Sequence, residues 1–536
     1  MNHIKIDPER ILSDIDRNVF GGYLEKGVLG GIYCPGSPRT DKDGLRSDVR
    51  AALQQMKMAN IRYGGNFFSG YHWMDGVGPQ QVRPGRLNLA WMNIVSNHFG
   101  TNEFINFCRK LNTEPYLCAN CGDGDMREAA DWVEYCNGTG DTALVKLRRE
   151  HGFEEPHKVK YWGIGNEVDS QGQIGYKTPH EYARSVTEFS KVMKRVDPDI
   201  KLIASAVSLW EDLPLEVGPR FLDPKTDWVE RTQLMLEQAG DRIDYLAIHR
   251  YAHPYDDDPY ENFMAFAEDF NERLSAYEGL IRAVSLERGI NHAVSIAVDE
   301  WGALPLPPEV RKYSPPIAIT ATSVAADKWG IMRLPYDQRE VRHKQMKMIM
   351  NLEDALITAM FLNAFIRHAY SVRMANFTPM MLSMAHTLWN TDLPDKLVPQ
   401  AIFFPFELYS STCGQLALDV FWYGDTFSGT YLNRAYAGIR TLDVAATLDE
   451  TRKKLVVYVV NQSKEEAMET TVTLTTGNFT GSMQVSVVNG PDIKAENTDE
   501  TPNQVGLREA ALKASGKSFT FTFEPHSVTA LVCGVS

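Results

Sequence analysis

The sequence predicts an α/β protein, a (β/α)8 TIM barrel followed by an antiparallel β-sandwich, and three observations support this fold class. Short apolar, β-branched runs alternate with long amphipathic segments from the N-terminus to about residue 380. There are eight such runs, which is the strand count of a (β/α)8 barrel. From about residue 440, alternating runs are separated by Gly, Asn, Asp and Pro clusters, a pattern typical of an antiparallel sandwich.

The predicted barrel strands share a polar or ionisable residue at or beside their carboxyl ends. Most of these ends lie 40 to 50 residues apart, which is one βα unit. In a barrel such ends meet at one face, where catalytic groups lie, whereas a purely structural role would require a partner for every buried polar group. The residues at the strand ends are Glu25, Asn66, Asn120, Glu167, Ser205, His249, Glu300 and Asn376.

Amphipathic segments between the strands predict the barrel helices. The Thr-Pro-His-Glu motif at 178–181 is a capping box with Pro at the first helical position, and apolar residues then recur at helical spacing up to the Asp-Pro pair at 197–198. Their apolar faces are expected to pack against the barrel. Similar segments cover residues 45–58, 102–111 and 340–368.

The segment at 302–340 differs from the other connections. Six prolines lie between Pro305 and Pro335, and the hydrophobic residues there have no clear period. Loops of this length in compact domains are usually functional covers or disordered segments. Because a βα loop lies on the active-site face of a barrel, we expect a partial cover over the site, with a flexible excursion as the alternative.

The charge balance argues against a polyanionic partner. The 536 residues include 55 Lys and Arg against 69 Asp and Glu, a formal net charge of −14 with His neutral. Nucleic-acid binding relies on dense Lys and Arg contacts to phosphate. We therefore expect no nucleic acid as partner, and a neutral ligand fits better.

The sequence also predicts a soluble, cytoplasmic protein with no membrane association. It has no run of 18 apolar residues, and residues 1–14 contain no signal-peptide core. Seven cysteines are an odd number, which suits reduced thiols better than a disulfide framework. The close pair Cys118 and Cys121 has no second ligand pair nearby, so we predict buried thiols and neither a metal site nor a cofactor.

Two carboxylates among the strand ends predict the chemistry. Glu167 and Glu300 lie three βα units apart, which places them on strands four and seven, across the barrel mouth from each other. Two carboxyl groups facing one substrate are the minimum apparatus for glycosidic bond cleavage, since one protonates the leaving oxygen and the other supports the oxocarbenium-like centre. Either residue alone would more often cap a helix or form an ion pair. Their joint placement favours catalysis.

Neighbouring residues suggest supporting roles. Asn166 precedes Glu167 directly and can reach the sugar hydroxyl next to the reacting carbon, a contact that strengthens in the transition state. His249 and Tyr251 come from the end of strand six, beside strand seven. Either is expected to hydrogen-bond Glu300 and keep it ionised as a nucleophile.

Eight short stretches, which together span nearly the whole predicted barrel, are similar to one known family and occur in its order. They are GGNFFSGYHWMDGVGP (64–79), RPGRLNLAW (83–91), HFGTNEF (98–104), AADWVEYCNG (129–138), VKYWGIGNEVD (159–169), IHRY (248–251), VDEW (298–301) and FIRHA (365–369). On these motifs the sequence resembles the α-L-arabinofuranosidases of glycoside hydrolase family 51.

The resemblance implies a retaining exo-hydrolase of clan A, with Glu167 as acid/base and Glu300 as nucleophile. Members are commonly intracellular homo-oligomers, often hexamers, and need no metal, so the implied partners are a furanoside oligosaccharide and further copies of the chain. The other site residues that the resemblance implies are Glu25, Asn66 and Asn166 as sugar-hydroxyl contacts, Arg62 as a supporting charge, and Tyr251 as the nucleophile's hydrogen-bond partner.

The domain boundaries follow from the strand pattern together with the resemblance. We expect a catalytic barrel over 18–385 and a β-sandwich over 386–536. The resemblance implies that 1–17 adds a strand to the sandwich. The sandwich strands predicted from alternation are 455–460, 470–475, 484–488, 518–523 and 528–532.

Three departures from the family pattern concern specificity. The Gly64-Gly65-Asn66 turn lacks the family's Pro, Gly172 stands where an aromatic wall is usual, and Pro379 stands in place of a sugar-binding Gln. Losing a hydrogen-bond donor from a polar pocket can change discrimination by orders of magnitude. The catalytic pair is intact, but the residues around the sugar are altered.

The sequence therefore leaves the sugar open. The first hypothesis is a retaining exo-α-L-arabinofuranosidase acting on short arabino-oligosaccharides. The second keeps the chemistry but changes the substrate to another furanoside, such as a galactofuranoside, or to an endo-acting β-glucan or xylan mode. A non-catalytic carbohydrate-binding relative and a zinc-dependent hydrolase are the remaining hypotheses.

Overall fold

The computed structural model describes most of the chain. A cover was predicted for the segment 302–340, of which the structure describes residues 302 and 303 while 304–340 lie outside the described residues. Gly172 also lies outside the described residues. The described residues are 2–25, 32–90, 93–170, 173–207, 228–252, 259–303, 349–381, 397–431 and 434–536.

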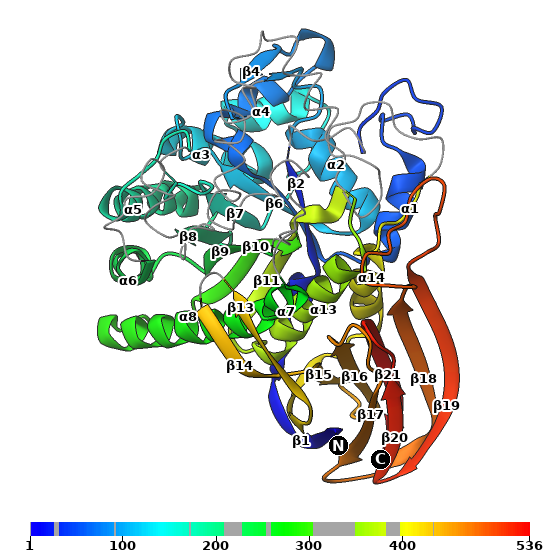
Figure 1. Ribbon diagram of the computed structural model, residues 1–536. Coiled ribbons are helices and arrows are strands. Elements are labelled where there is room, and N and C mark those ends of the chain that lie inside the picture. The colour runs from blue at the N-terminus through cyan, green and yellow to red at the C-terminus, as the bar shows by residue number, and fades with distance from the viewer. Residues whose placement is uncertain are drawn as a thin grey trace.

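Eight parallel strands close into a barrel, which confirms the predicted α/β fold class (Figure 1). The first strand pairs with the eighth through Gly21 and Gly22, opposite Asn376 and Phe377. Because the strands run parallel, their carboxyl ends meet at one mouth of the barrel. In chain order they are β2 (Gly21–Glu25), β3 (Asn60–Gly64), β6 (Glu114–Ala119), β7 (Tyr161–Ile164), β8 (Lys201–Val207), β9 (Tyr245–Ala252), β10 (Ser295–Ala303) and β11 (Val372–Phe377).

Helices follow the barrel strands. The capping box predicted at 178–181 is present, because the Thr178 side chain accepts from Glu181 N–H while the Glu181 carboxylate accepts from Thr178 N–H at 2.9 Å. No helix among the described residues is long and apolar enough to cross a membrane. The helices are α1 (Ser47–Gln55), α2 (Thr101–Leu111), α3 (Met126–Asn137), α4 (Ala143–Glu150), α5 (Pro179–Val196), α6 (Trp228–Ala239), α7 (Tyr260–Met264), α8 (Phe266–Arg288), α13 (Leu352–Arg367) and α14 (Phe403–Thr412).

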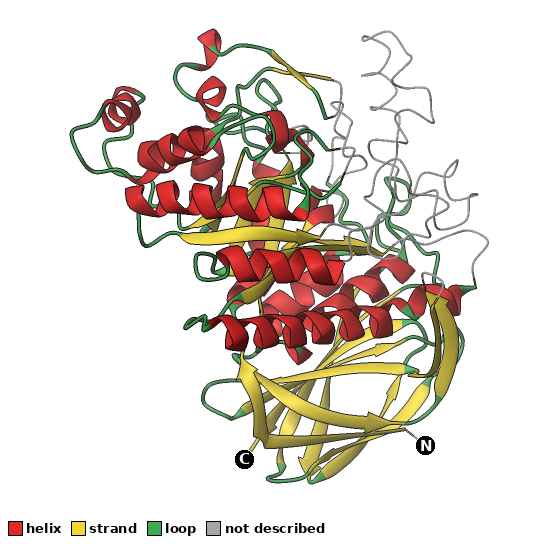
Figure 2. Ribbon diagram, turned by 90° about the vertical axis from the view of Figure 1, so that its left-hand side faces the viewer, coloured by secondary structure: helices red, strands yellow, loops and turns green. Residues whose placement is uncertain are grey.

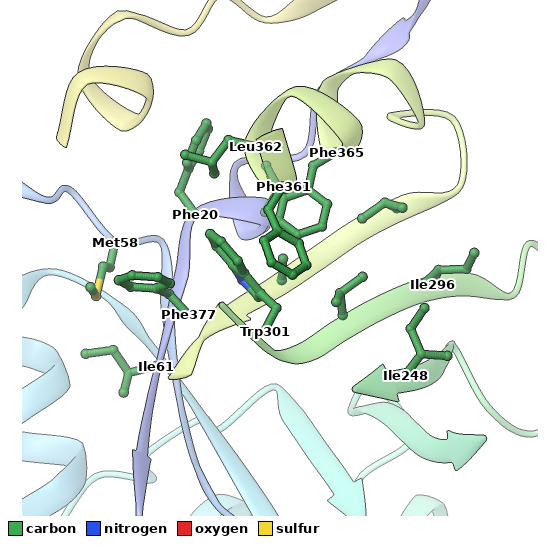
Figure 3. Packing of buried hydrophobic residues seen from close by; sticks show 14 of the residues in the cluster. Phe20, Met58, Ile61, Ile248, Ile296, Trp301, Phe361, Leu362, Phe365 and Phe377 are labelled. Atoms are coloured by element: carbon green, nitrogen blue, oxygen red, sulfur yellow. The ribbon is translucent and has the colours of Figure 1, made fainter. Parts of the chain in front are cut away.

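An aromatic cluster packs between β10 and α13 (Figure 3). The indole of Trp301 lies 5.1 Å from each of the rings of Phe361 and Phe365 and 4.8 Å from that of Phe377, measured between centroids. Each such ring buries roughly 150–250 Å². Since Trp301 follows Glu300 directly, this packing holds the part of β10 that carries the predicted nucleophile.

The C-terminal region forms a nine-stranded sheet with its own apolar core (Figure 2). Strand β1 (Asn2–Asp14) lies between β12 and β17, antiparallel to the first and parallel to the second. The parallel β1–β17 pair corrects the expectation of a purely antiparallel sandwich. The other strands of this sheet are β12 (Leu416–Tyr423), β15 (Leu442–Leu448), β16 (Lys454–Asn461), β17 (Met468–Leu474), β18 (Phe479–Asn489), β19 (Gly506–Gly516), β20 (Ser518–Phe523) and β21 (Ser527–Val535).

Two short hairpins stand apart from the two main sheets. One, made of β4 (Arg86–Asn88) and β5 (Asn93–Val95), belongs to the connection that follows β3. The other, made of β13 (Thr426–Tyr431) and β14 (Arg434–Arg440), lies against α7 and α8 of the barrel. The second hairpin therefore links the barrel to the C-terminal region.

Candidate active site

Glu167 reaches the barrel mouth through a turn after β7. Gly165 has φ +77°, and a Cβ at this position would approach Cys121 Cβ and Val168 Cγ1 to 2.9 Å, so the turn requires glycine. Glu167 itself has φ +45°, a left-handed conformation that costs a non-glycine residue of the order of 1 kcal/mol. The side chain is buried, with 8% of the residue exposed. Such strain at a buried carboxyl group is typical of functional sites.

Glu300 lies within β10, where the pairing is irregular. The register of β10 against β9 shifts between Ala297 and Glu300, as at a β-bulge. In a regular strand, consecutive side chains point to opposite faces. Here both Asp299 and Glu300 reach the same guanidinium, that of Arg62, inside the barrel. The site therefore contains a third carboxylate, Asp299, which was not among the predicted site residues.

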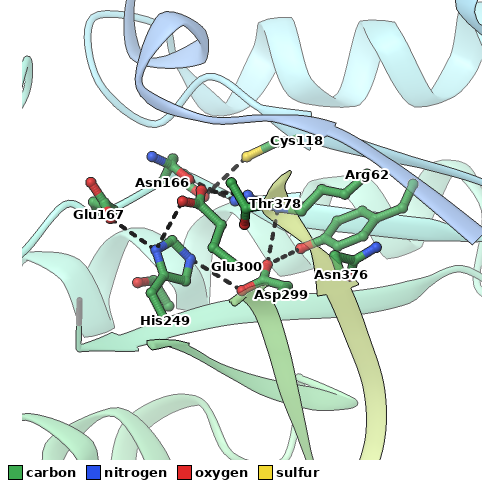
Figure 4. Close-up of polar contacts among 12 residues, drawn as sticks. Arg62, Cys118, Asn166, Glu167, His249, Asp299, Glu300, Asn376 and Thr378 are labelled. Carbon is green, nitrogen blue, oxygen red and sulfur yellow. Dashed lines mark hydrogen bonds and ion pairs between the residues drawn. The ribbon is translucent and has the colours of Figure 1, made fainter. Parts of the chain in front are cut away.

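The two glutamates lie close together and share a histidine (Figure 4). One oxygen of each glutamate and a ring nitrogen of His249 all lie within 4.8 Å of one another. His249 Nδ1 is 2.9 Å from Glu167 Oε1 and 3.6 Å from Glu300 Oε2, and its Nε2 is 3.1 Å from Asp299 Oδ1. Either His249 or Tyr251 was expected to bond Glu300, and of these two His249 has Glu167 as its closer partner.

The electrostatic environment favours a protonated Glu167. Burial raises the pKa of Glu167 above its ordinary value, and the nearby charge of Glu300 raises it further, while the hydrogen bond from His249 opposes both effects. Burial alone would lower the pKa of His249, but Glu300, Asp299 and Glu167 together raise it well above its ordinary value. The raised pKa favours a protonated His249, whose Nδ1 then donates to Glu167 and whose Nε2 faces Asp299.

Arg62 of β3 connects the groups around the predicted nucleophile. Its Nη1 is 2.7 Å from Glu300 Oε1, its Nε is 3.0 Å from Asp299 Oδ2, and its Nη2 donates to Asn166 Oδ1 at 2.6 Å. Burial would raise the pKa of Asp299, but the charges of Arg62 and His249 hold it below its ordinary value. The buried guanidinium thus faces two carboxylates and orients Asn166.

Tyr251 of β9 bonds the other oxygen of Glu300. Its hydroxyl donates to Glu300 Oε2 at 2.7 Å and also lies 3.0 Å from Thr378 Oγ1. Burial raises the pKa of Tyr251 well above its ordinary value, and the charge of Glu300 adds to the shift, so the phenol stays a donor. Glu300 therefore has a donor on each oxygen, Arg62 on Oε1 and Tyr251 on Oε2.

Polar side chains from three strand ends line the mouth beside Glu167. Asn166 Nδ2 donates to Asn66 Oδ1 at 2.8 Å, and Phe67 N–H donates to Glu25 Oε1 at 2.9 Å. Gly65 has φ +94°, and a Cβ there would meet Tyr23 Oη at 2.0 Å and Glu25 Cδ at 2.9 Å. The turn without the family's Pro therefore depends on Gly65, and it brings Asn66 to Asn166.

Two polar strand ends serve the scaffold instead of the site. Asn376 is fully buried, and its Nδ2 donates to Gly22 O at 2.8 Å and to Asn60 Oδ1 at 2.6 Å. Asn120 donates to Asp123 Oδ1 at 2.7 Å and accepts from Gly122 N–H at 2.9 Å, which stabilises the turn after β6. The hydrogen bonds of these two strand-end residues therefore go to the barrel scaffold.

The two closely spaced cysteines are buried thiols. Cys118 and Cys121 are free, and burial raises the pKa of Cys118 to about 12 and that of Cys121 to about 11. The thiol of Cys118 donates to Gly165 O at 3.1 Å, so it supports the turn that leads to Glu167. Among the described residues, the group whose ligand atoms are spaced closely enough to hold a metal ion is instead Glu167, His249 and Glu300.

Pro379 occupies the start of the turn after β11 and packs on β10. Its ring lies so close to Gly302 that a Cβ on that glycine would approach Pro379 Cδ to 2.6 Å. Proline has no N–H and its side chain has no polar atom. At the position where the resemblance implies a sugar-binding Gln, this chain therefore has an apolar ring.

Two family models match this chain. The one described as "Alpha-L-arabinofuranosidase 1 domain" covers residues 52–273, which include Glu167 and β3 to β9. The one described as "Alpha-L-arabinofuranosidase C-terminal domain" covers residues 299–527, which begin at Asp299.

Relatives match over nearly the full length. Alpha-L-arabinofuranosidase C of Emericella nidulans is 34% identical over 98% of this chain and 96% of the relative. Intracellular exo-alpha-(1->5)-L-arabinofuranosidase 1 of Bacillus subtilis is 31% identical over 97% of each chain. The crystal structure of an alpha-L-arabinofuranosidase from Thermotoga maritima in complex with arabinose superposes with a TM-score of 0.82, at 30% identity and 100% coverage of both chains.

Proposed function

Because this chain belongs to the α-L-arabinofuranosidases of glycoside hydrolase family 51, we propose that it releases terminal α-L-arabinofuranosyl residues from arabino-oligosaccharides by a retaining double displacement. Glu167 is the acid/base and Glu300 the nucleophile in this proposal. The relative from Bacillus subtilis is named an exo-α-(1→5)-L-arabinofuranosidase, which supports exo action on short oligosaccharides.

The carboxyl geometry is the observation that carries the proposal. One oxygen of Glu167 and one of Glu300 lie within 4.8 Å of each other. Retaining glycosidases place their two carboxyl groups about 5–5.5 Å apart, whereas inverting enzymes need about 6.5–9.5 Å to admit a water. The short separation supports direct attack by one carboxylate on the anomeric carbon.

The environments of the two glutamates support different roles in the first step. Burial and the charge of Glu300 raise the pKa of Glu167, so Glu167 can protonate the leaving oxygen. Glu300 accepts hydrogen bonds from Arg62 on one oxygen and from Tyr251 on the other, which orient the carboxyl group for attack on the anomeric carbon. In this step the Glu300 oxygen bonds to the anomeric carbon while the glycosidic C–O bond breaks and the leaving oxygen takes the Glu167 proton.

The second step reverses these roles. Glu167, now ionised, removes a proton from a water molecule, and the resulting hydroxide attacks the anomeric carbon and displaces Glu300. His249, which donates to Glu167 at 2.9 Å, stabilises the ionised form that this step requires. The sugar leaves with its original anomeric configuration, and Glu300 returns to its carboxylate form.

The residues beside the pair supply the sugar contacts in this proposal. Asn166 is held by Arg62 and Asn66, so its amide is positioned for the hydroxyl next to the anomeric carbon. Glu25 and Asn66 contact the other hydroxyls of the furanose. Pro379 removes one donor from this set, which favours the alternative that another furanoside, such as a galactofuranoside, is also accepted.

The location and assembly of the protein are part of the proposal. The relative from Bacillus subtilis is named intracellular, which supports a cytoplasmic location. A homo-oligomer, with a hexamer as the expected form, follows from the family resemblance. Sedimentation of the purified chain would test the assembly, and a monomer at micromolar concentration would contradict it.

A panel of 4-nitrophenyl glycosides tests the substrate. We expect kcat/KM to be highest for the α-L-arabinofuranoside and second highest for the β-D-galactofuranoside. Fragments of xylan and β-glucan should not be hydrolysed. A strong preference for any other glycoside would overturn the arabinofuranoside assignment. Sugar binding without hydrolysis of any member of the panel would support the non-catalytic alternative.

Incubation with EDTA separates this proposal from a zinc-dependent hydrolase. Glu167, His249 and Glu300 present ligand atoms at a spacing that a metal ion could use. In the proposed mechanism these atoms instead hold and transfer protons, so dialysis against EDTA should leave kcat/KM unchanged within about twofold. Loss of activity that zinc restores would favour the metal-dependent alternative.

A further inference from the structure

The turn after β11 carries a hydroxyl whose position the mechanism has not used. Thr378 begins the short 3-10 turn Thr378–Met381, and Pro379 packs directly on Gly302 of β10. This contact brings Thr378 beside the residues around Glu300 (Figure 4). Its Oγ1 lies 3.1 Å from Trp301 N and 3.0 Å from Tyr251 Oη.

The Tyr251 hydroxyl faces two described acceptors. It donates to Glu300 Oε2 at 2.7 Å and to Thr378 Oγ1 at 3.0 Å. Thr378 Oγ1 also accepts from Trp301 N–H at 3.1 Å, so the backbone next to Glu300 fixes the threonine oxygen that Tyr251 bonds.

We propose that Thr378 is a positioning residue for the nucleophile, acting through Tyr251. Trp301 N–H fixes Thr378 Oγ1, and the Tyr251 hydroxyl donates both to this oxygen and to Glu300. The second acceptor restricts the rotation of the phenol O–H and holds it beside Glu300 Oε2. Thr378 thus orients the hydrogen bond that Tyr251 makes to Glu300, without touching the sugar.

The alternative is a structural role that bypasses Tyr251. Thr378 also accepts the backbone N–H next to Glu300, so its removal could simply shift β10 at Trp301. The two roles differ in one respect. Only the proposed role requires the Tyr251 hydroxyl, so the effect of losing Thr378 should vanish when that hydroxyl is absent.

A double-mutant cycle with Thr378→Val and Tyr251→Phe separates these roles. The cycle rests on the proposed function in one respect, since its substrate is the aryl glycoside that the wild-type protein hydrolyses best. Thr378→Val keeps the volume but loses the donor and acceptor, and it should lower kcat by about three- to tenfold, with KM within about twofold. Thr378→Ser keeps the hydroxyl and should restore kcat to within about twofold of wild type. In the Tyr251→Phe background, Thr378→Val should have no further effect.

Two results would overturn the proposal. One is wild-type kcat in Thr378→Val, and the other is the same fold-loss with and without the Tyr251 hydroxyl. Thermal denaturation checks folding, and Thr378→Ala replaces Thr378→Val in the cycle if valine prevents folding. Absence of hydrolysis by the wild-type protein would reject the proposed function itself, which keeps the two failures distinct.

Discussion

Two buried clusters of charge lie on opposite sides of β9 and begin from adjacent residues. His249 points into the barrel mouth, toward Glu167 and Asp299, whereas Arg250 points outward to Asp269 of α8. Consecutive strand residues face opposite sides, so one strand serves both clusters. In the outer cluster, the fully buried Asp269 is bonded by Arg250, by Arg273 Nε at 2.9 Å and by Tyr436 Oη at 2.9 Å.

The difference between the clusters lies in their charge balance. The outer cluster surrounds one carboxylate with three guanidinium groups and a hydroxyl, since Arg434 Nη1 also lies 3.7 Å from Asp269 Oδ1, and its partners come from β9, α8 and β14. The inner cluster sets three carboxyl groups, those of Glu167, Asp299 and Glu300, against the two cations Arg62 and His249. A proton retained on Glu167 balances the inner charges. The outer cluster is therefore suited to stability and the inner one to proton transfer.

Replacing Glu300 by alanine should have the largest effect on activity. Without the nucleophile no glycosyl-enzyme forms, so kcat for an aryl α-L-arabinofuranoside should fall by on the order of 10⁴-fold or more. Thermal denaturation should show a folded protein, because Asp299 stays paired with the buried guanidinium of Arg62 at 3.0 Å. Normal turnover by Glu300→Ala would show that the inner cluster is not catalytic.

Replacing Glu167 by alanine should have the next largest effect. We expect kcat to fall by roughly 10²–10⁴-fold on a substrate that needs protonation of its leaving group. The loss in the glycosylation step should be much smaller for a 2,4-dinitrophenyl glycoside, whose leaving group departs without help. Comparing the two substrates gives the measurement, and an equal loss for both would rule out the acid role of Glu167.

Asp269→Asn tests the outer cluster, where we expect a loss of stability with little loss of activity. It removes the charge of the carboxylate that the buried guanidinium groups of Arg250 and Arg273 share, which should lower the free energy of unfolding by about 3–5 kcal/mol. Chemical denaturation measures this change, while kcat/KM of the folded variant should stay within about threefold of wild type. Asp141→Asn, at an exposed ion pair with Lys146, is the matched control and should cost less than about 1 kcal/mol. A large activity loss with unchanged stability in Asp269→Asn would erase the distinction between the clusters.

The pH dependence of activity provides a smaller test of the inner cluster. Glu167 must be protonated in the first step, and burial raises its pKa above the ordinary value. Activity should therefore persist above the range near pH 4–5 in which a solvated glutamate ionises, and it should fall as the pH rises through the pKa of Glu167. The profile of kcat/KM against pH measures this limb. A limb unchanged in Glu167→Ala would assign it to another group.

The sequence allowed the scaffold to be predicted where local chemistry is decisive. The capping box at Thr178 and Glu181 determines where α5 begins, and alternation locates strands such as β16 and β17. The parallel pairing of β1 with β17 joins segments far apart in the chain, and local pattern contains no information about such a partner. This is why the direction of that pair was missed.

Only part of the site could be predicted from the sequence, for a similar reason. Glu167 and Glu300 are recognisable from their places at strand ends, but strand alternation would turn Asp299 away from Glu300. The register shift in β10 brings both residues to Arg62, and no sequence signal indicates such an irregularity. Asn376 also lies at a strand end, but its amide faces a neighbouring strand, toward Asn60.

Methanolysis followed by ¹H NMR tests the central claim, that Glu167 and Glu300 act as the acid/base and nucleophile of a retaining enzyme. In the presence of methanol, a glycosyl-enzyme transfers its sugar to the alcohol, and the methyl glycoside does not mutarotate. From 4-nitrophenyl α-L-arabinofuranoside we expect methyl α-L-arabinofuranoside, with the configuration of the substrate. Methyl β-L-arabinofuranoside would mean inversion, and it would contradict the nucleophilic role of Glu300.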